Sequence, residues 1–129
     1  RYQYNNLMYL VAGVAIEKIT KKSWEEVTID RILKPLQMDH THFSIEQMQR
    51  YTDFAHPYLE KKDGTLKKMA FRDISTIGPA GSMHSNVNDM LKWVQMLLNG
   101  GVSGNQVLIS PSTLQELQTP QMVIGGTPE

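Results

Sequence analysis

Three short stretches of this chain combine side chains that could do chemistry. The first is Asp39-His40-Thr41-His42, in which an extended backbone would turn both imidazoles to one face. Imidazole is a common zinc ligand, so His40 and His42 could begin a metal site. A third ligand would have to come from His56, His84 or a carboxylate, and no spacing selects one. Histidines in a polar loop are more often simply solvated, so a metal-dependent hydrolase is the weaker hypothesis.

The second stretch, Gly81-Ser82-Met83-His84-Ser85, places serines beside a histidine. A nucleophile elbow needs Gly-x-Ser-x-Gly, which the sequence lacks. Adjacent serine and histidine residues rarely form a working dyad, so a tight glycine turn leading into a helix cap is the better interpretation. Ser-x-x-Lys and Lys-Thr-Gly are also missing. The sequence therefore contains no complete catalytic set.

The third stretch, Tyr4-Asn5-Asn6, stands directly before the apolar run Leu7 to Ile16. We expect a helix from about Asn6 to Ile19, with either asparagine as its N-cap. Its residues are apolar on every face until Glu17, which predicts a helix packed on all sides. Gly13 costs about 1 kcal/mol relative to alanine at such a position. It therefore predicts a close approach by another element.

The next elements follow from capping and turn residues. Ser23-Trp24-Glu25-Glu26 is a capping box that begins a second helix, which Pro35 is expected to stop. Residues 39–80 lose the helical period and are expected to be irregular. Within them, residues 55–60 and 65–71 predict a β-hairpin, because Asp63-Gly64 supplies the positive φ that such turns need. Its strands are rich in lysine and are expected to be exposed.

Two more helices are predicted in residues 81–119. The third helix should run from Val87 to Asn99, capped by Ser85 or Asn86, with Asp89 in its first turn. Gly100-Gly101 should end it in the left-handed conformation. Its expected buried stripe consists of Val87, Met90, Leu91, Val94, Leu97 and Leu98. The fourth helix should run from Pro111 to about Leu117 with Ser110 as cap, and residues 120–129, including Gly125-Gly126, should form a loop.

Composition excludes several classes of protein. The 129 residues fit one domain, and 13 basic residues balance 13 acidic ones, so no net charge favours nucleic acid or an anionic membrane as partner. The absence of cysteine excludes disulfides and thiolate metal sites. The ten-residue apolar run is shorter than the roughly 20 residues of a membrane span, and it lacks the flanks of a signal peptide. Because the chain begins at Arg1, we expect an internal piece of a longer protein.

Two long stretches carry a family resemblance. The segment from Tyr4 to Phe43 resembles the serine β-lactamase and penicillin-binding-protein family, most closely its class C, carboxypeptidase and esterase-like branch. The shared features are Tyr4 and Asn6 opening a buried helix, Ser23 to Glu26 capping the next, Pro35-Leu36-Gln37-Met38, and Thr41 with Phe43. The segment from Gly78 to Gly101 is similar to the family's Pro-Ala-Gly-Gly segment, with Ser82 where a second glycine is usual.

The resemblance implies an acyl-enzyme hydrolase that acts on β-lactams, peptides ending in D-alanine, or esters, without a cofactor. Tyr4 would be catalytic and shuttle a proton, and Asn6 would bind the amide side chain of the substrate. The nucleophilic serine and its lysine would come from a segment before Arg1, so the chain alone should be inactive. A catalytically dead relative that senses cell-wall peptides is the alternative.

The resemblance also implies a fold and a location. The chain would be a single incomplete domain, residues 1–129, of α+β class and predominantly helical, formed by the helical lobe of the family fold plus the hairpin. Residues 1–38 would contain two helices. Exposed apolar surface could drive self-association. By family analogy the whole protein would be bacterial and extracytoplasmic, either secreted or membrane-anchored.

Overall fold

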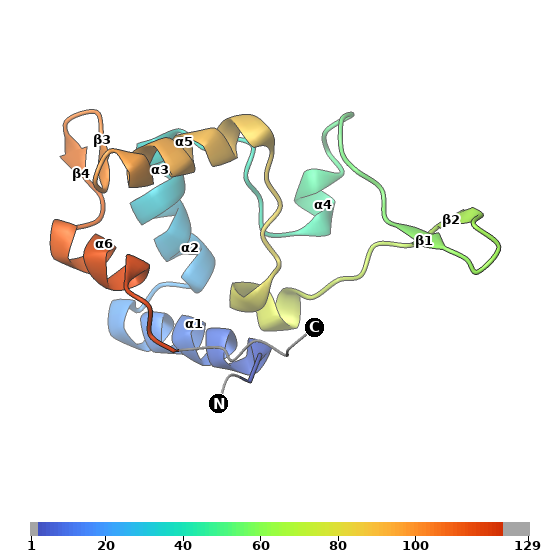
Figure 1. Cartoon of the computed structure of the whole chain (residues 1–129), viewed down its shortest axis with the longest axis horizontal. Helices are drawn as coiled ribbons and strands as arrows, with labels where there is room; N and C mark the ends of the chain where they lie inside the picture. The colour runs from blue at the N-terminus through green and yellow to red at the C-terminus, as the bar shows by residue number, and fades with distance from the viewer. Residues whose placement is uncertain (1–2, 123–129) are drawn as a thin grey trace, which may run out of the picture.

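The computed structural model describes residues 3–122, which form helices and two small antiparallel sheets (Figure 1). About half of the chain is helical, so the predicted α+β, predominantly helical class is confirmed. The α-helices are α1 (Asn6–Thr20), α2 (Trp24–Thr28), α3 (Lys34–Leu36), α4 (Ile45–Met48), α5 (Val87–Leu98) and α6 (Pro111–Gln118). The strands are β1 (Tyr58–Glu60), β2 (Leu66–Lys68), β3 (Val102–Ser103) and β4 (Gln106–Val107). None of the helices in this part of the chain is long and apolar enough to span a membrane.

The first helix, α1, begins where the sequence predicts. Asn5 is its N-cap, and the side-chain oxygen of Asn5 accepts a hydrogen bond from the Leu7 amide at 2.8 Å. Gly13 is the buried residue of this helix, and a Cβ atom built on it would collide with the ring of Pro79. The predicted close approach at Gly13 is therefore confirmed, and its partner is a 3₁₀ segment, Ser75–Ala80.

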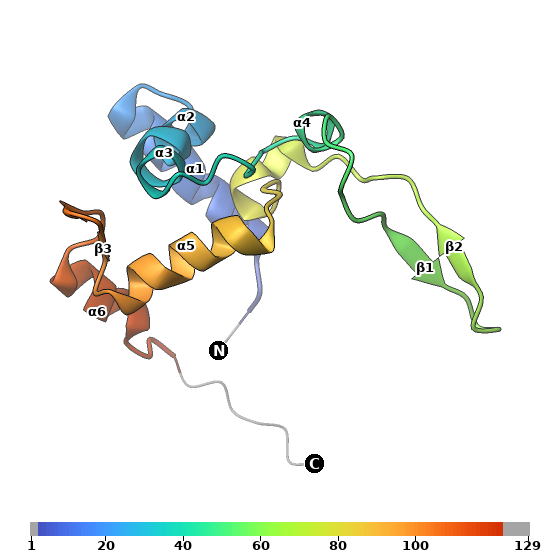
Figure 2. The same cartoon turned by 90° about the horizontal axis from the view of Figure 1, so that it is seen from above.

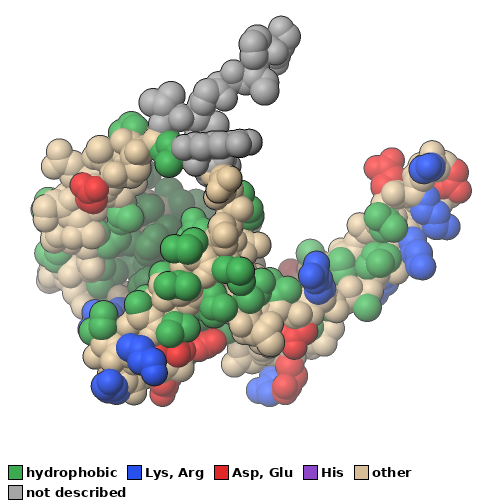
Figure 3. Space-filling view, turned by 90° about the horizontal axis from the view of Figure 1, so that it is seen from below, with side chains coloured by type: hydrophobic (Ala, Val, Ile, Leu, Met, Phe, Trp, Pro, Cys, Tyr) green, Lys and Arg blue, Asp and Glu red, His purple; other side chains and the backbone are tan. Residues whose placement is uncertain are grey.

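The expectation that α1 is packed on all sides is wrong for this chain. Several of its apolar side chains are more than half exposed, among them Leu7, Met8, Tyr9 and Val11. Figure 3, in which the molecule is seen from below, shows hydrophobic side chains gathered along the face of α1. A helix with apolar residues on every face is expected to be buried on every face. Within residues 3–122, however, only one side of α1 is covered.

The second predicted helix passes through Pro35 instead of stopping there. The capping box is confirmed, since Ser23 accepts from the Glu26 amide at 3.1 Å and Glu26 accepts from the Ser23 amide at 2.8 Å. α2 continues through a π-helical turn, Ile29–Leu33, into α3. In this turn the Lys34 amide bonds the carbonyl of Ile29, five residues earlier. This wider spacing accommodates the proline ring, which would clash with a carbonyl four residues earlier in a regular helix.

The predicted hairpin forms with shorter strands than expected. β1 and β2 pair antiparallel, with Tyr58 opposite Lys68 and Glu60 opposite Leu66, and Gly64 has the positive φ that the turn requires (+80°). The hairpin projects away from the helices (Figure 2). Residues 39–80 are less irregular than expected, because they also contain α4 and the 3₁₀ segment.

The expected buried stripe of α5 is wrong: the helix buries its other face. Asp89 and Met96 are buried, and Met96 packs with Leu33, Leu36 and Met38 in the core. In the expected stripe, Leu97 is half-buried against this core, whereas the other members are exposed, with Val87 and Leu98 at 74% and 82%. Periodicity identifies a stripe on a helix but not which neighbour will meet it, and α5 carries apolar side chains on two opposite faces.

The last predicted helix is confirmed. α6 is capped by Ser110, which accepts from the Thr113 amide at 3.2 Å, and Pro111 occupies its first turn. Gly100 and Gly101 have positive φ (+70° and +88°), and the Gly101 amide bonds the Met96 carbonyl at 3.0 Å, which ends α5 as predicted. The β3–β4 hairpin that follows was not predicted, although Gly104-Asn105 between its strands is a two-residue turn signal. The loop predicted for residues 120–129 lies largely outside the described residues.

Candidate active-site segment

Tyr4 and Asn6 lie at the N-terminal end of α1. Tyr4 precedes the cap residue Asn5, and Asn6 is the first residue of the helix. Both side chains are exposed, Tyr4 at 72%. Asn5 performs the capping, so Asn6 is not needed for it and its amide is available to a ligand.

The helix behind these two residues is fixed at its middle and at its far end. The collision that a Cβ at Gly13 would make with Pro79 shows how closely the backbones approach there. At the other end, the Glu17 carboxylate accepts from the Trp24 amide at 3.2 Å, and Lys21 ends the helix in the left-handed conformation. The 3₁₀ segment and α2 therefore fix α1 at its middle and at its C-terminal end, and the exposed first turn with Tyr4 and Asn6 extends from this anchored part of the helix.

A cation for Tyr4 is not available from α1 itself. Lys18 lies in the last turn of the helix. Fourteen residues at 1.5 Å each separate it from Tyr4, a distance of roughly 20 Å. The helix N-terminus favours an anion by only about 0.3–1 kcal/mol. Any tyrosinate at this position needs a cation from another segment.

Ser82 and His84 do not form a catalytic dyad. Ser82 is buried, and its hydroxyl donates to the Gly78 carbonyl at 3.1 Å. The Gly81 amide bonds the same carbonyl at 3.0 Å, and two residues after His84 the side chain of Asn86 caps α5. The interpretation as a glycine turn that leads into a helix cap is confirmed.

His42 and His84 lie opposite each other in a short antiparallel bridge. The His42 amide donates to the His84 carbonyl at 2.8 Å, and the His84 amide donates back at 2.7 Å. Nε2 of His42 and Nδ1 of His84 are buried without a hydrogen-bond partner. Burial lowers the pKa of His42, and the neighbouring His40 lowers it further.

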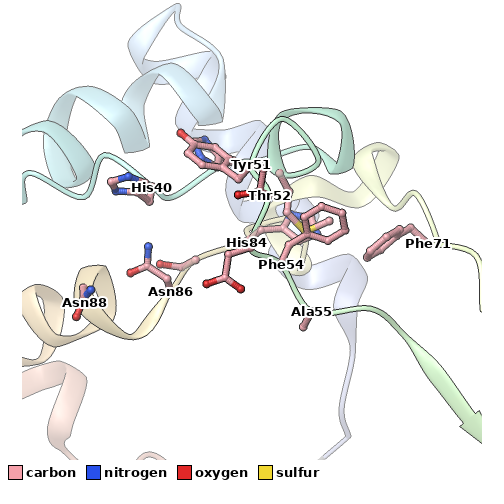
Figure 4. A pocket seen from close by; sticks show the side chains of 13 residues that line it. His40, Tyr51, Thr52, Phe54, Ala55, Phe71, His84, Asn86 and Asn88 are labelled. Carbon is pink, nitrogen blue, oxygen red and sulfur yellow. The ribbon is translucent and has the colours of Figure 1, made fainter. Parts of the chain in front are cut away.

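These histidines line an open pocket of about 490 Å³ together with aromatic side chains. The pocket runs from Asn88 at one end to Phe71 at the other (Figure 4). The ring of Tyr51 stacks on His42 with a centroid distance of 4.9 Å and lies 5.6 Å from His40. Within residues 3–122, no three His, Asp or Glu side chains gather closely enough to hold a metal ion. The metal hypothesis built on His40 and His42 thus gains no third ligand from the structure.

Asp89 has a structural role that the sequence did not reveal. Its side chain is 1% exposed and accepts hydrogen bonds from the His40 amide and the Thr41 hydroxyl, both at 2.9 Å, and from the Lys92 ammonium at 3.1 Å. Burial opposes ionisation, but these hydrogen bonds outweigh it and hold the pKa of Asp89 below its usual range. The sequence signal was only an acid in the first turn of a helix, and nothing in it pointed to a partner 49 residues away.

The described residues thus form a largely helical unit with Tyr4 and Asn6 exposed at the N-terminal end of α1. The family model described as Beta-lactamase matches residues 1–128, and the chain belongs to this family.

Relatives and solved structures agree with this assignment. The chain is 33% identical over 99 residues to "Unguisins hydrolase ungD'" of Aspergillus campestris and 30% identical over 98 residues to "Protein flp" of Staphylococcus aureus. These matches cover 75% and 76% of the chain but only 18% and 19% of the relatives, so the chain spans about a fifth of their length.

Two solved structures share the fold. The octameric penicillin-binding protein homologue from Pyrococcus abyssi matches with a TM-score of 0.79 at 28% identity, over 98% of this chain and 28% of that one. A D-stereospecific amidohydrolase from Streptomyces matches with a TM-score of 0.70 at 23% identity, over 92% of this chain and 33% of that one. The chain therefore has the fold of a helical portion of the family domain.

Proposed function

We propose that this chain is the tyrosine-bearing part of a serine hydrolase that works through an acyl-enzyme. The observation that carries the proposal is the exposed pair Tyr4 and Asn6 at the end of a helix that Gly13 locks against Pro79. Membership of the Beta-lactamase family and the hydrolase name of one relative support it. The substrates would be β-lactams, peptides ending in D-alanine, or esters.

Each residue of the pair has a role in this proposal. The phenol of Tyr4 moves a proton between the nucleophilic serine, a lysine and the leaving group, and the amide of Asn6 hydrogen-bonds the substrate. A tyrosine in water has a pKa of about 10, so a tyrosine base near pH 7 needs roughly 4 kcal/mol of stabilisation. The helix end supplies about a quarter of this at most. The rest has to come from a cation, and the lysine beside the nucleophile, outside these 129 residues, would provide it.

The accessible surface of the chain is larger than a folded monomer of its mass usually exposes, which supports its being part of a longer protein. Its accessible surface is 10,411 Å², whereas a folded monomer of 14.7 kDa exposes roughly 6,900 Å². We propose that residues 1–129 form one incomplete domain of a longer, extracytoplasmic protein. The apolar faces of α1 and α5 would pack against the rest of that protein, and in the isolated chain they would drive self-association.

The test compares Tyr4→Phe with Tyr9→Phe, which changes a second exposed tyrosine, five residues further on in α1. In the longer protein, Tyr4→Phe should lower kcat/KM for a chromogenic β-lactam or an aryl ester by about 10²–10⁴-fold, the usual contribution of a general acid or base. Tyr9→Phe should leave it nearly unchanged. The isolated 129-residue chain should show no turnover.

Two results would contradict the proposal. One is turnover by the isolated chain that Tyr4→Phe abolishes, which would place the whole site within these residues. The other is binding of a labelled D-alanyl peptide without turnover and with no effect of Tyr4→Phe, which would favour the catalytically dead sensor.

A further inference from the structure

The β1–β2 hairpin is an arm with almost no support from the rest of the chain. We define the arm as residues 57–69. All of its residues are exposed except Pro57, which is half-buried. A two-stranded hairpin is marginally stable by itself in water. The arm leaves the helices and projects outward, as Figure 2 shows. It is therefore placed to meet another surface.

The arm is basic although the chain as a whole is neutral. Its charged side chains are two acids, Glu60 and Asp63, and four lysines, Lys61, Lys62, Lys67 and Lys68. The arm thus has a net charge of +2, and because the whole chain is formally neutral the remainder has −2. The neutral total charge of the chain therefore conceals a local excess of positive charge on the arm, which projects from the helices.

Each face of the arm combines lysine with apolar side chains. Paired residues lie on the same face of a hairpin, and alternate residues lie on opposite faces. Leu59 is opposite Lys67, and the Met69 amide bonds the Pro57 carbonyl at 2.9 Å, so these four residues share one face. The other face carries Tyr58, Glu60, Leu66 and Lys68. The large apolar side chains of the arm are exposed: Tyr58 by 57%, Leu59 by 52%, Leu66 by 68% and Met69 by 42%.

We propose that the arm docks on an anionic lipid surface. Four clustered lysines attract the negative potential of such a surface, and leucine, methionine and tyrosine side chains insert at the boundary between headgroups and acyl chains. Pairing of two arms is disfavoured, because lysines on open strand edges repel one another. A soluble polyanion would satisfy the lysines but give the apolar side chains no site. This inference does not depend on the proposed hydrolase activity, and its test measures binding alone.

The experiment measures binding of the 129-residue chain to sedimented vesicles, either pure phosphatidylcholine or containing 30% phosphatidylglycerol. Lys61→Gln/Lys62→Gln is the arm variant, and Lys18→Gln/Lys21→Gln, which removes the same charge from exposed positions on and just after α1, is the matched control. Each lysine near an anionic surface changes the partition coefficient about fivefold. We expect the arm variant to bind anionic vesicles about 25-fold more weakly, and the control variant to keep most of its binding.

A second variant reports on the apolar side chains. Leu59→Trp places an indole on the mixed face of the arm. Its contribution, taken as the difference between the emission of the variant and that of the wild type with Trp24 and Trp93, should shift to the blue with anionic vesicles but not with polyphosphate. Neither change touches a buried residue, so circular dichroism should be unchanged. Equal binding to both kinds of vesicle, equal losses in the arm and control variants, or a Leu59→Trp emission that vesicles leave unchanged would each overturn the proposal. Binding to polyphosphate alone would also overturn it.

Discussion

Replacing Asp89 is the sharpest test of how this chain holds its segments together. Three donors converge on the buried carboxylate: the His40 amide, the Thr41 hydroxyl and the Lys92 ammonium. The first two donors join the segment after α3 to the first turn of α5, and Lys92 lies on α5 itself. Asp89→Ala removes all three acceptor contacts at once.

The size of the destabilisation depends on which other acceptors each donor can reach once the Asp89 carboxylate is gone. The Thr41 hydroxyl can still bond Ser85, which lies 2.8 Å away, and Lys92 also reaches the Gln37 carbonyl and water. The His40 amide is partly buried, and within residues 3–122 its hydrogen bond goes to Asp89 alone, so losing this bond costs about 1–3 kcal/mol. Adding the loss of two charge-assisted contacts gives a destabilisation of about 3–4 kcal/mol. For a chain of this size the melting temperature should fall by about 15 °C.

The assay is urea denaturation followed by the fluorescence of Trp24 and Trp93, at one fixed protein concentration. Asp89→Asn keeps one carbonyl acceptor and should cost about half as much as Asp89→Ala. Asp39→Asn is the control, because Asp39 is exposed and its side chain makes no hydrogen bond to any of residues 3–122; its effect should stay within about 0.5 kcal/mol.

The same substitution has a pH signature. The pKa of Asp89 is lower in the folded chain than in the unfolded one, so its ionised form stabilises the fold. This contribution is complete above the unfolded pKa of about 3.9 and is lost as the pH falls through the lower folded value. The difference between the wild type and Asp89→Asn should therefore shrink below about pH 4. Equal stability of Asp89→Ala and Asp39→Asn at pH 7 would show that the Asp89 carboxylate does not hold these segments together.

Three further predictions concern packing, protonation and exposed surface. Gly13→Ala should destabilise the chain by about 1–3 kcal/mol despite the better helix propensity of alanine, because the new methyl group would collide with Pro79. In a double-mutant cycle, Pro79→Ala should restore part of this loss, and additive effects would mean that the two residues do not collide. Burial lowers the pKa of His42, so the unfolded chain binds more protons and its stability should fall as the pH drops from about 6.5. His42→Phe should flatten this slope in thermal melts, and an unchanged slope would contradict the prediction. The isolated chain should elute as a dimer or larger from a sizing column, and Leu91→Glu on the exposed face of α5 should reduce this; a monomer that binds no hydrophobic dye would contradict the expectation.

Elements with local signals could be predicted from the residue types alone. Asn5 caps α1, Ser23 and Glu26 form a capping box, Gly64 turns the hairpin, and Ser110 caps α6, as predicted. Each of these depends on hydrogen bonds or backbone angles within a few residues, so the residue types are sufficient to specify them. The Tyr-x-Asn pair and its family context were also visible in the sequence.

Which helix faces pack together could not be predicted from local patterns. α5 carries apolar residues on two sides, and the side with Met96, not the expected stripe, packs against Leu33 and Leu36. The bond from Asp89 to His40 and the bridge between His42 and His84 join residues more than 40 positions apart. Such contacts depend on how whole elements pack. A local pattern indicates that a face of a helix or strand needs to be covered, but it does not indicate which element will cover it. For the same reason a neutral total charge concealed the basic arm, which becomes a distinct surface only when the hairpin projects from the fold.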